Sequence, residues 1–101
     1  MEDFESLDLH DASINGITID WGAGTVTVDA LVFREGRALS AKRCKLVWSG
    51  VTRFVADREL PWGPSNFVNT AKFEEPSRYE LQMQSGDVLL IDAKAFILHN
   101  A

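Results

Sequence analysis

His10 and Asp11 are adjacent residues whose types could do acid–base chemistry. An imidazole held by a carboxylate can act as a general base or bind a metal ion. Neighbouring residues of a β-strand point to opposite faces, so these two side chains cannot pair with each other if the segment is extended. The alternative is structural: Asp11 caps or turns the backbone, and His10 stands at the entrance of a strand. We favour this structural role.

A metal site would require His10 and His99 to converge with some of the scattered aspartates. The two histidines lack the spacing of a zinc-binding motif, and the single cysteine, Cys44, excludes a cysteine-rich zinc site. Cys44 alternates in phase with Leu46 and Trp48, so we expect it in the core rather than as a nucleophile. The sequence contains no Gly-x-Ser-x-Gly motif and no phosphate-binding glycine loop. We therefore expect no catalytic residues, no metal and no cofactor.

The segment 60–66, with the sequence LPWGPSN, presents Trp62 between two prolines. The prolines remove backbone donors and force an irregular loop. A stiff loop that presents an indole can anchor a partner, because tryptophan is enriched at interface hot spots. The alternative is that Trp62 folds back and closes one end of a barrel. The candidate partner-binding residues are Trp62, Ser65, Asn66 and Asn69, together with His10 and Asp11.

The elements that must position these residues are predicted to be strands, because the hydrophobic pattern has a period of two. Apolar residues alternate with polar ones over 17–21, 26–32, 42–48 and 79–84, with glycine-rich turns between them. Asn15-Gly16 marks either a hairpin turn or a bulge. Val51–Arg58 is either strand or helix. Val88–Leu98 is expected to be one strand that is apolar on both faces, and therefore central or covered by a partner.

These patterns predict an all-β (or mainly β) protein of about six strands. Short turns favour an antiparallel meander that forms a sandwich or open barrel. The length of 101 residues, with 46% hydrophobic and 25% charged residues, is typical of one soluble domain, here residues 1–101. No apolar run approaches the roughly 20 residues of a membrane span. The acidic start of the chain lacks the features of a signal peptide, so we expect a cytoplasmic protein with no membrane partner.

The charges are segregated along the chain, whose net charge is −5. Residues 1–33 contain seven acids and no Lys or Arg, whereas residues 34–58 contain seven bases and two acids. We interpret this as complementary charge on neighbouring strands. The alternative is a basic patch for an acidic partner. Nucleic acid is not expected, because the chain is acidic overall and its basic stretch lacks interleaved aromatic residues.

Three segments resemble a group of small uncharacterised bacterial proteins. They are LHDA at 9–12, PWGPS at 61–65 with Val68-Asn69, and MQSGD at 83–87. The similarity spans nearly the whole chain and implies a bacterial, cytoplasmic protein, but it implies no activity and no functional residue. In size and charge the chain is also similar to immunity-type proteins that neutralise toxins.

The sequence therefore favours a non-enzymatic binding or protein-interaction module, and an immunity-like inhibitor is one form that such a module could take. Its partner would be another protein or a second copy of itself, because the two-sided final strand and the segregated charges suit a homodimer. The alternative is a small hydrolase that is metal-dependent or uses His10 and Asp11 as a general base.

Overall fold

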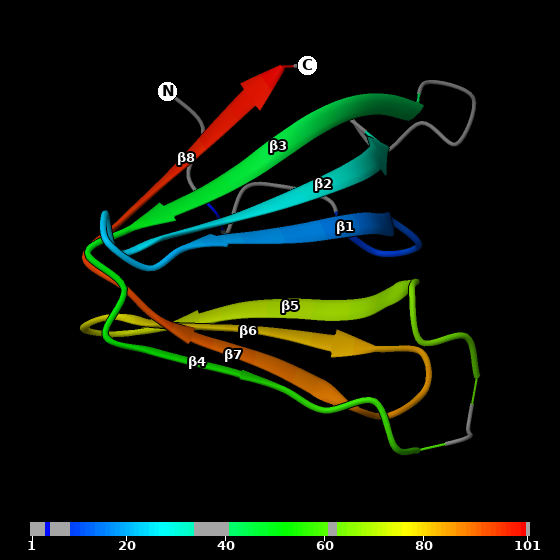
Figure 1. Cartoon of the computed structure of the whole chain (residues 1–101). Coiled ribbons are helices and arrows are strands. Elements are labelled where there is room, and N and C mark those ends of the chain that lie inside the picture. Colours follow the sequence, from blue (N-terminus) through cyan, green and yellow to red (C-terminus); the bar gives the residue numbers. More distant parts are fainter. Residues whose placement is uncertain (1–3, 5–8, 34–40, 61–62, 101) are drawn as a thin grey trace.

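Two four-stranded antiparallel sheets face each other in the computed structural model, which describes Phe4 and residues 9–33, 41–60 and 63–100 (Figure 1). The first sheet has the order β1-β2-β3-β8 and the second β4-β7-β6-β5. The predicted all-β sandwich is confirmed. In the described residues no helix is long and apolar enough to cross a membrane. The strands of the first sheet are β1 (Ser13–Asp20), β2 (Thr25–Phe33), β3 (Ala41–Ser49) and β8 (Ala95–Asn100); those of the second are β4 (Arg53–Ala56), β5 (Val68–Glu74), β6 (Arg78–Met83) and β7 (Val88–Asp92).

The core lies between the sheets and is made by the alternating residues that the period of two identifies. Removing these apolar side chains from water is the main force that holds the sheets together. Cys44 is fully buried, as expected from its phase. The largest fully buried side chains are Trp48, Leu46, Leu81, Ile91, Val26, Val28, Val32 and Val68.

The chain passes from one sheet to the other twice, between β3 and β4 and between β7 and β8. The two crossings lie against each other, because the Lys94 amide donates to the Ser49 carbonyl at 3.0 Å. The expectation of one strand over Val88–Leu98 is therefore wrong. Where the chain crosses to the other sheet, the residues that face the core change from odd-numbered to even-numbered ones. Ile91, before the crossing, is therefore buried, whereas Ile97, after it, is 42% exposed. Apolar residues on both faces thus need no covering partner here.

Eight strands are present instead of about six, partly because of this crossing and partly because β5 has a broken pattern. A register shift between Val68 and Thr70 interrupts its alternation. A second shift, between Ile14 and Gly16, shows that Asn15-Gly16 is a bulge rather than a hairpin turn.

Of the two structures expected for Val51–Arg58, strand or helix, the chain forms a strand there, β4. The meander is also not continuous: β1–β3 and β5–β7 each form one, and β4 and β8 join the opposite sheets.

Opposite charges meet on neighbouring strands. Lys45 on β3 lies 3.9 Å from Asp29 on β2, and Lys72 on β5 lies 3.1 Å from Glu80 on β6. The Asp29–Lys45 pair joins the acidic first third of the chain to its basic middle third within one sheet, as the complementary-strand interpretation expects. Such exposed pairs contribute at most about 1 kcal/mol each.

Candidate functional site

Phe4 fills the space between the sheets on one side of the sandwich. Its ring lies between β3 and β8 of one sheet and β6 of the other, with centroids 6.1 Å from Trp48, 5.3 Å from Phe96 and 5.2 Å from Tyr79. Only 4% of Phe4 is exposed. The tilted and edge-to-face arrangements are those that aromatic pairs prefer. This side of the sandwich is closed by the chain itself.

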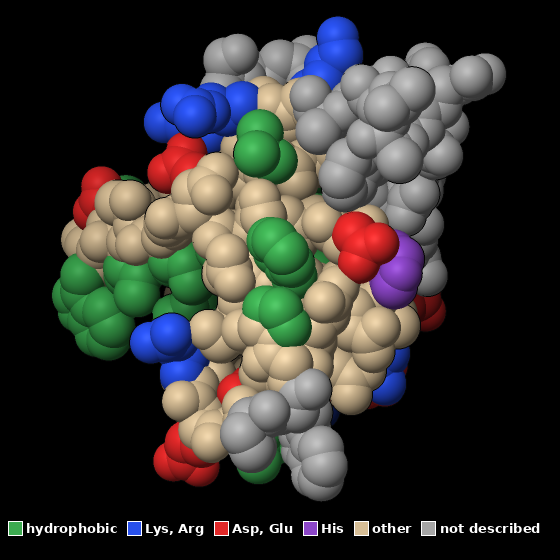
Figure 2. Space-filling view, turned by 90° about the vertical axis from the view of Figure 1, so that its right-hand side faces the viewer, with side chains coloured by type: hydrophobic (Ala, Val, Ile, Leu, Met, Phe, Trp, Pro, Cys, Tyr) green, Lys and Arg blue, Asp and Glu red, His purple; other side chains and the backbone are tan. Residues whose placement is uncertain are grey.

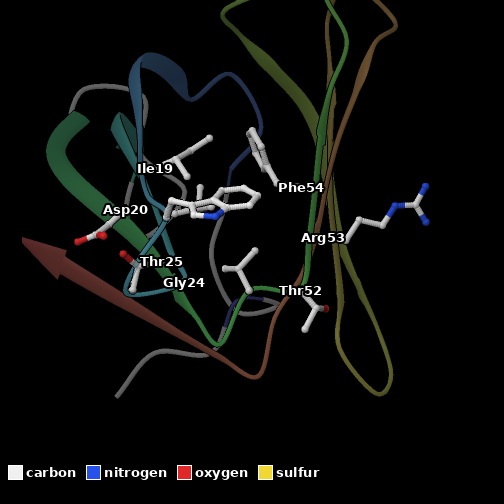
Figure 3. A pocket seen from close by; sticks show the side chains of 10 residues that line it. Ile19, Asp20, Gly24, Thr25, Thr52, Arg53 and Phe54 are labelled. Atoms are coloured by element: carbon white, nitrogen blue, oxygen red, sulfur yellow. The ribbon is translucent and has the colours of Figure 1, made fainter.

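A groove opens on another side of the sandwich, between the edge strands β1 and β4. It consists of adjoining cavities of about 590 and 410 Å³. Ile19 and Phe54 face each other across it, while Arg53 points away (Figure 3). We call this feature the β1–β4 groove, and its apolar lining consists of Ile14, Ile17, Ile19, Trp21, Val26, Val51, Phe54, Ala56, Met83 and Leu89.

The β1 side of this groove exposes large apolar side chains. Trp21 is 91% exposed, Ile19 49% and Ile17 39%. Their alternation predicted an inward, buried face, and that prediction is wrong for this half of β1, because the inward face opens onto the groove. Figure 2 shows hydrophobic side chains gathered along one side of the molecule. Clustered apolar exposure of this kind marks an interaction surface more often than a single exposed residue does.

The outer edge of β1 is only partly paired. At its start it forms a short ladder with residues 66–68, in which the Ile14 amide donates to the Asn66 carbonyl at 2.7 Å and the Val68 amide donates to the Ala12 carbonyl at 2.9 Å. Beyond the bulge, Gly16–Asp20 pairs with β2 alone among the described residues. This stretch has no proline or lysine, which proteins use to protect strand edges. Within the described part of the chain, this stretch is therefore open to another strand.

His10 and Asp11 lie in a turn before β1, away from the groove. The Asp11 backbone is in the left-handed region, with φ 65°, which lets the two neighbouring side chains come together as an extended segment would not. Nδ1 of His10 donates to the Asn69 carbonyl at 2.7 Å, and Nε2 lies 3.5 Å from the Asp11 carboxylate. The other Asp11 oxygen accepts a 2.6 Å hydrogen bond from Nε2 of Gln84.

This polar cluster ties the start of β1 to β5 and to the end of β6. The Asp11 amide adds a hydrogen bond to the Val68 carbonyl at 2.8 Å. These contacts match the structural role favoured for His10 and Asp11. His99 lies on the outward face of β8, opposite Lys45. Within the described part of the chain, no three His, Cys, Asp or Glu side chains are grouped so as to hold a metal ion.

The proline-containing loop contributes Ser65 and Asn66 to one end of the groove. Ser65 Oγ accepts hydrogen bonds from the Arg58 guanidinium at 3.0 and 3.3 Å. Gly63 packs so closely on the turn after β6 that a Cβ atom there would lie 2.7 Å from the Gln84 carbonyl oxygen. Trp62, the leading candidate from the sequence, lies outside the described residues. Of the predicted set, the structure thus brings His10, Asp11 and Asn69 together, and places Ser65 and Asn66 at the groove.

Asp87, in the turn between β6 and β7, anchors the segment that leads into this loop. Its buried carboxylate accepts from the amides of Glu59 and Leu60, at 3.1 Å each, and from the Ser85 hydroxyl at 2.9 Å. Burial alone would raise the pKa of Asp87. The hydrogen bonds from Glu59, Ser85 and Leu60, with the nearby Arg58 charge, outweigh burial and hold the pKa below its usual value.

Acid is therefore expected to loosen the loop. A carboxyl group whose pKa is lower in the folded state stabilises that state above its unfolded pKa, about 3.9, and the stabilisation is lost as pH falls toward the lower folded value. Amide hydrogen exchange at Glu59 and Leu60 should accelerate below about pH 4, beyond the intrinsic change with pH. In Asp87→Asn the exchange should already be fast at neutral pH and show no such step. Unchanged protection in Asp87→Asn would contradict the anchoring role.

The groove residues Ile17, Ile19, Trp21 and Phe54 were not predicted as a site. One feature of the sequence pointed to the exposure of Trp21. It directly precedes the turn Gly22-Ala23-Gly24, and a tryptophan at the tip of a hairpin lies beyond the part of the strand that covers the core. The roles of Asp87 and Gln84 could not be recognised in the sequence, because their partners lie far away along the chain.

Comparisons of this chain with protein-family models, curated proteins and solved structures find no match.

Proposed function

We propose that this chain is a non-enzymatic protein-interaction module and that it binds its partner at the β1–β4 groove. The observation that carries this proposal is the contrast between the two sides of the sandwich. Phe4 closes one side, whereas the other exposes Trp21 at 91% and Ile19 at 49% beside a strand edge that no described residue pairs with. An exposed indole next to apolar walls is typical of an interface anchor.

The polar contacts support binding rather than catalysis. His10 and Asp11 hold the junction of β1 and β5, and the groove is lined mainly by apolar side chains. Ser65 and Asn66 supply polar groups at one end of the groove. An apolar centre with a polar rim is the usual anatomy of a protein interface. The hydrolase alternative has no comparable support.

Selection from a library of displayed random peptides tests this function. We expect the wild-type chain to enrich peptides with alternating apolar residues, because a strand added to β1 would direct every second side chain into the groove. Ile19→Lys should weaken their binding by about tenfold or more. Ile97→Lys is the matched control, since Ile97 is similarly exposed, at 42%, but lies on β8. No enrichment, or equal binding to Ile19→Lys, would count against the groove as the binding surface.

A further inference from the structure

We infer that the partner at this surface is a second copy of this chain, whose β1 pairs antiparallel with β1 across a two-fold axis at Thr18. This inference rests on the proposed function. The first argument is continuity, because the same edge of β1 already accepts a strand. Residues 66–68 form a ladder with its first residues through the Ile14 and Val68 amides. A second copy would continue the pairing beyond the bulge.

The backbone groups of Ile17 and Ile19 point toward the free edge. Lys94 donates to the Ser49 carbonyl, which fixes which residues of β3 face β8. Successive residues of an antiparallel strand direct their backbone groups to opposite neighbours. Ser49 therefore faces β8, and the residues of β3 that alternate with it face β2. The same alternation across the β1–β2 register directs Thr18 toward β2, and it directs Ile17 and Ile19 toward the outer edge, where no described residue pairs with them.

The sequence of this edge is self-complementary when the two-fold axis passes through Thr18. Ile17 then lies opposite Ile19 of the second copy, and each such pair exchanges both N–H···O hydrogen bonds. Thr18 faces Thr18, a favourable cross-strand pair. Asp20 faces Gly16, so no two carboxylates oppose each other. Neighbouring two-fold registers are worse, because they bring the bulge at Asn15 or the turn at Trp21 into the ladder.

The exposed apolar area suits a weak dimer. Trp21 exposes nearly its whole side chain, on the order of 200 Å². Burying this residue in both copies would remove about 400 Å² from water, roughly a quarter of a standard interface of about 1,600 Å². The half-exposed isoleucines and the backbone ladder add to this area, and the total stays below that of a standard interface. We therefore expect a reversible dimer in the micromolar range.

Replacing Thr18 with a positively or a negatively charged residue tests both the dimer and its register. Sedimentation equilibrium of the wild-type chain should show reversible association of the 11.3 kDa monomer into a species of twice that mass. Thr18→Lys and Thr18→Glu should each dimerise more weakly than the wild-type chain, by up to about fivefold, because like charges then lie directly opposite each other. Mixing the two variants should restore at least the wild-type affinity, since only a two-fold axis at Thr18 places this residue opposite its own counterpart. Thr27→Lys, one strand further from the axis on the same outer face, should still dimerise.

Three results would overturn the inference. A wild-type chain that stays monomeric throughout the micromolar range has no such partner; binding of peptides to the same edge would then leave the proposed function standing. A dimer whose affinity is the same as that of the wild-type chain in both Thr18 variants uses another surface. Failure of the mixed variants to associate, when wild type does, excludes the axis at Thr18.

Discussion

Replacing Phe4 with alanine is expected to lower the free energy of unfolding by about 3–5 kcal/mol, the usual cost of truncating a buried aromatic side chain. Phe4 is 4% exposed and touches aromatic rings of both sheets. Its removal would leave a cavity among Trp48, Tyr79 and Phe96, which are held in place by their own strands and cannot collapse into it. Chemical denaturation followed by far-ultraviolet circular dichroism measures the change. A stability of 5–15 kcal/mol is typical of a small domain, so the loss would be large.

Phe54→Ala is the matched control, because it removes the same side chain from the open side of the sandwich. Phe54 is only half-buried and lines the β1–β4 groove. Its truncation should cost less than half as much, since part of the ring is already in contact with water and no closed cavity forms. Equal losses in the two variants would show that the two sides of the sandwich do not differ as described.

The class of fold could be predicted from the sequence because it depends on local alternation. A period of two over 26–32 and 79–83 identifies strands with one buried face, whatever their neighbours are. The path of the chain could not be predicted in the same way. Val88–Leu98 has the pattern of one strand, because no glycine or proline at Ala93-Lys94 marks the point where the chain crosses between the sheets. At this point the residues that face the core change from odd-numbered to even-numbered ones.

The candidate site was predictable only in part. His10 and Asp11 stand out by residue type, but their pairing depends on the left-handed backbone of Asp11, which alternation does not reveal. Ile17 and Ile19 have the pattern of core residues, and their exposure depends on how far the two sheets diverge at this side. The pattern shows which residues share a face. It does not show whether another layer covers that face.

Gly50 is the residue on which the first crossing between the sheets depends, and Gly50→Ala is expected to destabilise the fold by about 2–3 kcal/mol. Gly50 has a φ of 62°, a conformation that costs other L-residues about 1–2 kcal/mol. A Cβ atom there would also lie 2.9 Å from Cβ and Cγ of Lys94, on the second crossing. The substitution would therefore strain the backbone and push apart the two crossings that join the sheets. Denaturant unfolding measures the loss.

Two further variants separate these causes. Gly22→Ala, in the exposed turn between β1 and β2, should change stability by no more than about 0.5 kcal/mol, because its Cβ would meet only the Asp20 carboxylate at 3.8 Å. Combining Gly50→Ala with Lys94→Gly removes the side chain that the new Cβ would strike. The double variant should then cost less than the sum of the two single variants, by the part of the loss that comes from contact. Strict additivity would assign the whole effect to the backbone conformation of Gly50, and the packing of one crossing on the other would have no energetic role.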